Sequence, residues 1–382
     1  MDGMRWLALA LALVPACNLK FNSQPCGTAD NQWICAEGLA CADPPTYCGT
    51  PPPPDQCAQL ADFTPCSLAT GDGVCLSGVC GPCAAETAGC KTHGAWEVMA
   101  SGTTQTLRSL WVASETDVYV VGDMATLLHY DGHMWTALDS SVFGVATSLL
   151  SIWGADDDHL FVVGGKNAYR LVAGVWTREL TQQSNFLNAV WGSAVNDVRA
   201  VGANGVIYQF DGTQWNPEPS GTIATLNAIW GTDANHIWAV GNPIGAGSTV
   251  LSFNSGVWGP VGVQAQDPNQ ALNAIGGSGP ADVYAVGDPS SGVVTVIQQQ
   301  PGSWLPLDEA DVQDEALLAV WARGPGDFLI GGHDGLLIEG QGTTWTTHTT
   351  NTSAEIDAVM GSSADNIFAV GAGGLILHYT TD

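Results

Sequence analysis

The sequence predicts an all-β protein, a seven-bladed β-propeller that is closed by an N-terminal strand in the last blade and preceded by a small disulfide-rich region. Two observations predict the propeller: a unit of about forty residues recurs seven times, and each unit contains short runs typical of β-strands. The clustering of all 11 cysteines within residues 17–90 predicts the smaller region. We therefore expect a signal peptide over residues 1–16, a Cys-rich stalk over 17–92 with a spacer at Pro51–Pro54, and the propeller over 93–382.

The composition is that of a folded, strongly acidic protein. With 382 residues, 45% of them hydrophobic, the chain can bury a large core. Nine Lys and Arg residues stand against 37 Asp and Glu residues, and the formal net charge of -28 repels nucleic acid and anionic lipid surfaces. We expect a protein or glycan ligand, no nucleic acid, and a monomer that contacts a membrane only through a lipid anchor.

The first 17 residues have the pattern of an export signal. Arg5 precedes an apolar run at residues 6–14, which is too short to cross a bilayer as a helix, and the run leads into VPAC at residues 14–17. This pattern resembles a bacterial lipoprotein signal with its lipobox. The resemblance implies that Cys17 is lipidated and that the protein lies in the cell envelope, as an outer-membrane lipoprotein or at the cell surface. The alternative is an ordinary secretory signal, with Cys17 among the disulfides and the protein secreted.

Setting Cys17 aside leaves an even set of ten cysteines, which the proline spacer divides into four and six. Each group can close its own disulfides, with three and fifteen possible pairings. The ten are Cys26, Cys35, Cys41, Cys48, Cys57, Cys66, Cys75, Cys80, Cys83 and Cys90. Zinc is the alternative at Cys80–Cys83, but that CxxC pair has no second pair at matching spacing, which favours disulfides. Residues 64–80 resemble the C-x-x-G-x-C turns of EGF-like and disintegrin-like modules, and we expect a stiff stalk.

Residues 187–215, LNAVWGSAVNDVRAVGANGVIYQFDGTQW, define the repeated unit. Two landmarks recur, a glycine that ends an apolar run and a tryptophan late in the unit. The glycines are Gly122, Gly164, Gly202, Gly241, Gly287, Gly332 and Gly371. The tryptophans are Trp96, Trp135, Trp176, Trp215, Trp258, Trp304 and Trp345. Runs rich in Val, Ile, Ala and aromatic residues alternate with Gly, Asn, Asp and Ser, which favours four strands per unit over two helices.

The last unit stops at Asp382 after three strands, without its tryptophan strand. A matching fragment, HGAWEVMASG at residues 93–102, stands before the first unit. We expect residues 95–100 to pair with the third strand of the last unit. This pairing closes the ring and removes an exposed sheet edge.

Three motifs carry a family resemblance: Trp-Gly in the first strand, Ala-Val-Gly in the second, and D-G-x-x-W before the fourth, as at Asp131–Trp135 and Asp211–Trp215. By these motifs, about three quarters of the chain resembles bacterial propellers of the BNR and photosystem II assembly factor type. The resemblance implies the propeller fold. It does not extend to sialidase activity, because the aspartate and tryptophan lie four positions apart here and five apart in the sialidase Asp-box.

Loop lengths indicate where a ligand binds. From the first-strand landmark, such as Trp191, to the second-strand glycine the distance is 11 residues in all seven units, whereas the other spacings vary from 12 to 18 residues. The variable segments are the turns between strands 2 and 3 and the blade-to-blade connections, which share one rim, here termed the connection rim. Insertions in units 4, 5 and 6 predict ligand binding on this rim; the alternative is that insertions accumulate wherever they are tolerated. The predicted residues are Asn242, Pro243, Asp267, Asp288, Asp308, Glu309 and Asp311.

Residues 308–315, DEADVQDE, place five carboxylates on the connection rim. They lack the ligand ladder of a calcium loop, so we expect no cofactor and no metal, with Ca²⁺ as the alternative. The sequence contains no G-x-S-x-G, H-E-x-x-H or phosphate-binding glycine loop, and we predict no catalytic residues. The predicted function is a non-enzymatic, lipid-anchored envelope protein that binds a protein or glycan. The alternatives are a secreted glycan-active hydrolase or lyase of propeller fold and an envelope assembly factor.

Overall fold

The structure is a computed structural model of the 382-residue chain, which divides into two compact units, the second of them Gly94–Thr381. The residues that it describes are 65–68, 71–76, 79–82, 95–180, 184–245, 247, 249–263, 270–290, 293–307, 315–342 and 344–380. Among these residues, no helix has the length and apolar character needed to cross a membrane.

The first unit contains a three-stranded antiparallel sheet. Its strands are β1 (Pro65–Leu68), β2 (Gly71–Leu76) and β3 (Val79–Pro82), in the order β1-β2-β3. The backbone register places Cys75 opposite Cys80 on β2 and β3, and Cys66 lies in β1. The predicted lipidation site Cys17 and the other predicted disulfide cysteines lie outside the described residues.

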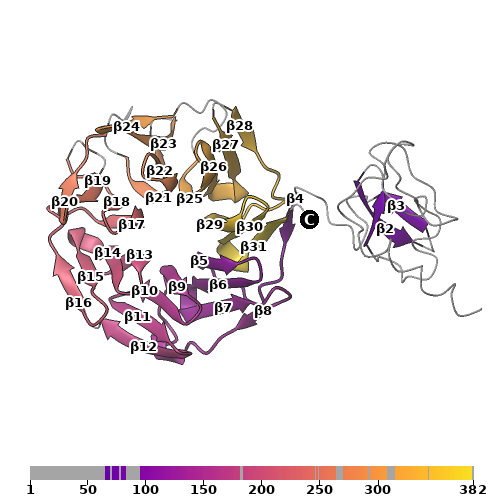
Figure 1. Ribbon diagram of the computed structural model, residues 1–382, viewed down its shortest axis with the longest axis horizontal. Helices are drawn as coiled ribbons and strands as arrows, with labels where there is room; N and C mark the ends of the chain where they lie inside the picture. The colour runs from indigo at the N-terminus through magenta and orange to yellow at the C-terminus, as the bar shows by residue number, and fades with distance from the viewer. Residues whose placement is uncertain are drawn as a thin grey trace, which may run out of the picture. The chain divides into compact units, whose positions relative to one another are not determined.

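The second unit is a propeller of seven four-stranded antiparallel sheets around one axis, as predicted (Figure 1). Blades 1 to 3 comprise β5 (Leu107–Ser114), β6 (Asp117–Gly122), β7 (Thr126–Tyr130) and β8 (Trp135–Ala137); β9 (Ser151–Asp156), β10 (His159–Gly164), β11 (Asn167–Val172) and β12 (Val175–Leu180); and β13 (Leu187–Ala194), β14 (Asp197–Gly202), β15 (Ile207–Phe210) and β16 (Trp215–Glu218). In each blade the chain runs from the innermost to the outermost strand and then crosses to the next blade.

Blades 4 to 6 repeat the same order of strands. They comprise β17 (Leu226–Asp233), β18 (His236–Gly241), β19 (Thr249–Asn254) and β20 (Val257–Pro260); β21 (Leu272–Gly279), β22 (Asp282–Ser290), β23 (Val293–Gln300) and β24 (Ser303–Pro306); and β25 (Leu317–Gly324), β26 (Asp327–Gly332), β27 (Leu337–Gln341) and β28 (Thr344–Thr347). Short 3-10 turns punctuate the connection rim. They are η1 (Asp123–Ala125), η2 (Ser141–Phe143), η3 (Ala203–Gly205), η4 (His333–Gly335) and η5 (Ala372–Gly374).

Blade 7 joins the two ends of the propeller. Its first three strands are β29 (Ile356–Ser363), β30 (Asn366–Gly371) and β31 (Ile376–Thr380), and its outermost strand is β4 (Ala95–Val98). β4 pairs antiparallel with β31, with Trp96 opposite Tyr379, and the Met99 N–H extends the ladder by donating to the Ile376 carbonyl (2.8 Å). Figure 1 shows β4 lying beside β31 at the edge of the blade. The predicted closure is confirmed.

A glycine recurs at the same position of the second strand in every blade because no side chain fits there. A Cβ at Gly202 would collide with the carbonyl oxygen of Phe186, where the chain enters the innermost strand, and the same collision recurs at the equivalent glycine of each blade. The four residues before Gly202 are buried. Val198 and Ala200 pack with Phe161 of the preceding blade, and Val201 packs with Leu226 of the following blade. Burial between the neighbouring blades explains why this strand is apolar apart from Asp197 and Arg199.

The two rims carry different turns. The turns between strands 1 and 2, and between strands 3 and 4, form the hairpin rim, opposite the connection rim. Two residues separate strands 1 and 2 in all seven blades, which accounts for the constant spacing in the sequence. In blade 5, β22 extends to Ser290 and β23 begins at Val293, and these two residues pair, so that the extended backbone satisfies its own hydrogen bonds.

Candidate functional site

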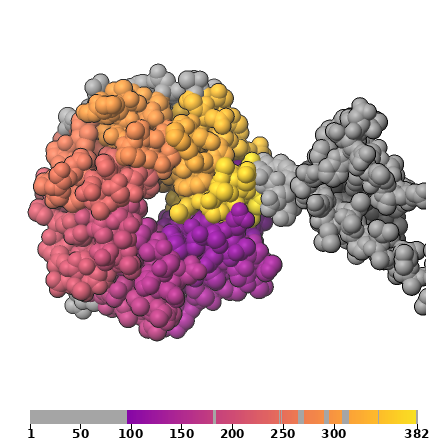
Figure 2. All heavy atoms as spheres, in the orientation of Figure 1, coloured from indigo at the N-terminus to yellow at the C-terminus, as the bar shows by residue number. Residues whose placement is uncertain are grey.

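The innermost strands of the seven blades surround a central channel with a volume of about 340 Å³ (Figure 2). Most of the side chains that line the channel are apolar, small or amide groups. Arg108 and Asp357 are the only charged residues in this lining. Both stand at the beginning of an innermost strand, which places them at the mouth of the channel on the connection rim.

Arg108 bridges the first and last blades at this mouth. Its Nε and Nη2 donate to the two carboxylate oxygens of Asp123 in η1 (3.3 and 2.8 Å), and its Nη1 donates to Oδ1 of Asp357 (3.1 Å). The hydrogen bond to Asp123 raises the pKa of Arg108. Burial acts to raise the pKa of Asp123, but the hydrogen bonds from Arg108 and Ser148 and the charge of Arg108 together outweigh it, and that pKa is lowered. Burial raises the pKa of Asp357 to about 6, against the opposing effect of Arg108.

Two of the predicted rim residues also reach the channel mouth. Asn242 Oδ1 accepts a hydrogen bond from Asn227 Nδ2 (2.8 Å), and Asp288 Oδ1 accepts one from Asn273 Nδ2 (2.7 Å). The two donors, Asn227 and Asn273, belong to innermost strands. Asn242 and Asp288 therefore brace the strand 2–3 turns of blades 4 and 5 against the channel, while their own side chains remain exposed.

Five large apolar side chains are exposed along the connection rim over blades 1 to 4, and together they are here termed the apolar arc. They are Met124, Val145, Phe186, Ile223 and Ile244. Their exposed fractions run from 44 to 82%, and each stands in a strand 2–3 turn or a blade-to-blade connection. Lys166 lies 5.3 Å from the centre of the Phe186 ring. Such a run of exposed apolar groups on one face is typical of an interaction surface.

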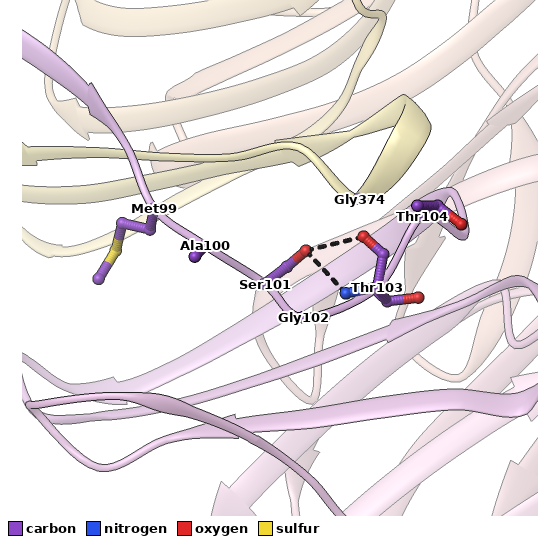
Figure 3. A pocket seen from close by; sticks show the side chains of 7 residues that line it. All are labelled: Met99, Ala100, Ser101, Gly102, Thr103, Thr104 and Gly374. Atoms are coloured by element: carbon purple, nitrogen blue, oxygen red, sulfur yellow. Dashed lines mark hydrogen bonds between the residues drawn. The ribbon is translucent and has the colours of Figure 1, made fainter.

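Two shallow hollows on the connection rim have a structural cause. In the first, Ser101 turns back on its own chain beside Gly374, donating to the Thr103 carbonyl (3.2 Å) and accepting from the Thr103 N–H (3.4 Å) (Figure 3). The second repeats this turn at Ser220–Thr222 and has a volume of about 570 Å³. Its lining includes Ile223 and Ile244, so the second hollow is part of the apolar arc.

The hairpin rim is acidic, and its carboxylates hold their own turns. Asp211 Oδ1 accepts hydrogen bonds from the Thr213 hydroxyl (2.6 Å) and from the main-chain N–H groups of Gln214 and Thr213 (2.9 and 2.8 Å), and these bonds lower the pKa of Asp211. Asp156 Oδ1 accepts a hydrogen bond from the main-chain N–H of Asp158 in the same way (3.0 Å). Within the described parts of the chain, no group of three or more His, Cys, Asp or Glu side chains could hold a metal ion.

Solved structures similar to this chain are propellers from varied settings. One is YCF48 bound to D1 peptide, with a TM-score of 0.63 and 18% identity over 76% of this chain and 97% of that one. Another is the extracellular domain of the putative one-component system BT4673 from B. thetaiotaomicron, with a TM-score of 0.60 and 14% identity over 75% and 40% of the two chains. A third is the RRP9 WD40 repeats, with a TM-score of 0.61 and 11% identity over 75% and 99%. Such identities show a shared fold alone. No protein-family model and no curated protein matches this chain.

Hydrolysis of a glycosidic bond needs two carboxyl groups on opposite sides of the bond, about 5 to 10 Å apart. Among the residues that line the channel, Asp357 is the only carboxylate. Arg199 is 3% exposed and is paired with Asp197 and Glu218 of its own blade (2.9 and 3.1 Å), so its charge is neutralised within blade 3. The channel therefore offers no pair of acidic groups for the hydrolase alternative.

The sequence predicted part of this surface. Asn242, Pro243 and Asp288 lie on the connection rim in the structure, whereas Asp267, Asp308, Glu309 and Asp311 are outside the described residues. The apolar arc was missed. Its signal was an apolar residue in turns that otherwise consist of polar residues and glycine, as at Ile223 in SGTIAT.

Proposed function

We propose that this protein is a non-enzymatic binding protein of the cell envelope that holds a partner protein against its connection rim. The observation that carries the proposal is the apolar arc, of which Ile223 and Ile244 line one hollow, because contiguous exposed apolar side chains are typical of a surface that binds something. A rigid ring of buried strands holds the turns that present these side chains, which suits a recognition surface.

The partner that fits this surface presents apolar side chains flanked by basic ones. The chain carries 37 acidic against nine Lys and Arg residues, so a basic partner is attracted over long range. On the connection rim itself, the exposed carboxylates of Asp288 and Asp334 complement such charges. The YCF48 structure with its bound D1 peptide supports a peptide or protein ligand for a propeller of this shape.

A lipid anchor at Cys17 completes the proposal. The export pattern of residues 1–17 supports it, and the proline-containing segment before the propeller would hold the binding rim away from the membrane. A Cys17→Ser variant that still fractionates with membranes would rule out this anchor.

The binding test compares two rims of one molecule. Phe186→Asp with Ile223→Asp places charge in the apolar arc. Val175→Asp with Val257→Asp makes the same change at exposed first residues of β12 and β20, next to the turns of the hairpin rim. Each full-length variant is used as bait for envelope extract, and the captured protein is then titrated against each bait at low and high salt. We expect the arc variant to weaken binding at least about tenfold, which corresponds to about 1.4 kcal/mol.

The hairpin-rim variant is expected to bind like the wild type, and salt is expected to weaken binding because the charges attract. Equal affinity for the wild type and the arc variant would show that the connection rim is not the binding surface. A partner that is lost only from the hairpin-rim variant would reverse the assignment of the rims.

A further inference from the structure

The interfaces between neighbouring blades are here termed seams. At three of them, an asparagine forms a hydrogen bond across the seam near the channel mouth. Asn188, Asn227 and Asn273 stand at the second residue of β13, β17 and β21, the same position in blades 3, 4 and 5. Each Nδ2 donates a hydrogen bond to the main-chain carbonyl of the first residue in the next innermost strand. The acceptors are Leu226 (2.9 Å), Leu272 (2.9 Å) and Leu317 (3.1 Å).

Asp357 takes this position in blade 7, at the seam that closes the ring. It is the second residue of β29, and the acceptor that corresponds to Leu226 is the carbonyl of Leu107, the first residue of β5. An ionised carboxylate has no proton to donate, unlike the amide of asparagine. Oδ1 accepts the hydrogen bond from Arg108, whereas Oδ2 is buried and has no hydrogen-bond partner among the described residues.

Three charged groups act on Asp357 from the elements packed around it. Arg108 on β5 favours the ionised form, and Asp123 in η1 and Glu355, just before β29, favour the protonated form. His333 of η4 lies beyond Glu355, with 3.6 Å between its Nε2 and the carboxylate. Burial of Asp357 is the largest effect, and it raises the pKa from an ordinary value near 4 to about 6.

We propose that Asp357 is a proton-dependent latch of the closing seam. When protonated, its Oδ2–H donates to the Leu107 carbonyl, as the asparagine amides donate at their seams. When Asp357 is ionised this bond is absent, and a buried oxygen is left without a partner, which is costly. Through this latch, mildly acidic surroundings tighten the closing seam. The channel mouth on the proposed binding rim is tightened with it.

The direction of the pH effect follows from linkage. A carboxyl whose pKa is higher in the folded chain binds its proton more tightly there than in the unfolded chain. The stabilising contribution of Asp357 is therefore complete below about pH 4 and is lost as the pH rises through about 6.

The test uses Asp357→Asn, which keeps the size of the side chain and supplies a permanent donor. Thermal unfolding of the full-length protein is followed from pH 4.5 to 7.5. We expect the variant and the wild type to melt within about 1 °C of each other at pH 4.5, and the variant to melt about 2 to 4 °C higher at pH 7.5. The converse variant, Asn227→Asp, places a carboxyl at an asparagine seam and is expected to lose stability as the pH rises.

Infrared spectroscopy supplies a second measurement that does not depend on unfolding. The wild type at pH 5 is expected to show the carbonyl stretch of a buried protonated carboxyl that fades toward pH 7.5 and is missing from Asp357→Asn. Parallel melting curves for the wild type and Asp357→Asn over the whole range would overturn the latch. If Asp357→Asn does not fold, the proposal is overturned by an Asn227→Asp variant whose stability changes with pH as the wild type's does.

Discussion

The seams between blades fall into two kinds. In five of them, an innermost-strand tryptophan lies against a glycine of the next blade, as Trp153 does against Gly192, where a Cβ would stand 2.8 Å from the ring. The other pairs are Trp111–Gly154, Trp191–Gly231, Trp230–Gly277 and Trp321–Gly361. At the seam between blades 5 and 6, Gly276 stands in place of the tryptophan, and a Cβ there would lie 2.6 Å from the Val320 carbonyl oxygen. The backbones take up the space that the indole fills elsewhere.

The closing seam is the other exception. Met360 replaces the tryptophan of blade 7, and Val112 replaces the glycine of blade 1; both belong to one apolar cluster. The difference teaches that the Trp-Gly dipeptide of the sequence is not one packing unit. Its tryptophan packs on the glycine of the following blade, so the absence of one residue accompanies the absence of the other across a seam. The same holds at the seam between blades 5 and 6: Gly276 replaces the tryptophan of blade 5, and Ala322 replaces the glycine of blade 6.

Deleting residues 94–100 removes β4 and is expected to have the largest effect. Blade 7 then loses its whole outermost strand, including the buried Trp96 that packs against blade 6, and β31 is left with an unpaired edge. Such an edge favours association with other chains. We expect aggregation or loss of a single cooperative transition, measured by calorimetry together with light scattering.

Val98→Thr is the control for this deletion, because Val98 is exposed and its substitution leaves the β4 backbone pairing in place. It should melt as the wild type does. A deleted protein that remains monomeric with an unchanged transition would show that the ring does not depend on β4.

Gly192→Ala tests a tryptophan seam at a smaller scale. The added methyl group would lie 2.8 Å from the Trp153 ring and 2.9 Å from Val198, and the packed indole has little room to move. We expect a loss of about 1 to 3 kcal/mol in the free energy of unfolding by chemical denaturation. Gly259→Ala, at a glycine with no atoms near its Cβ position, should change that free energy by less than about 0.5 kcal/mol. Equal losses at both sites would remove the distinction between seam glycines and other strand glycines.

Much of the fold could be predicted because the repeat copies one unit seven times. The constant 11-residue spacing in the sequence corresponds to a two-residue turn between strands 1 and 2, and the stray tryptophan segment around Trp96 matched the strand that the last unit lacks. The packing partners of the tryptophan and the glycine in each Trp-Gly dipeptide could not be predicted in the same way. Contacts between blades join residues about forty positions apart, and a sequence pattern gives spacing within a unit but not which neighbour a side chain faces.

The candidate site was harder to predict than the fold. Insertions pointed to the connection rim, yet Met124, Phe186 and Ile223 of the apolar arc stand in turns of ordinary length. A single apolar residue in a turn gives no sign of its exposure until the turn is folded. Asp357 was equally invisible, because its meaning depends on the asparagines in the same position of other blades and on the burial of one oxygen.

Asn227→Ala is the mildest of these changes and separates the asparagine seams from the closing seam. It removes the hydrogen bonds to Asn242 and to the Leu272 carbonyl, and we expect a loss of about 1 to 2 kcal/mol in the free energy of unfolding. The size of this loss relative to the wild type should be the same at pH 5 and at pH 7.5. Asn216→Ala is the matched control, because that amide bonds only to groups of its own exposed turn, Asp211 and Gln214, and should cost less than about 0.5 kcal/mol. If the two losses are equal, the bond across the seam contributes nothing beyond an ordinary surface contact, and the equivalence of Asp357 with the asparagines loses its energetic basis.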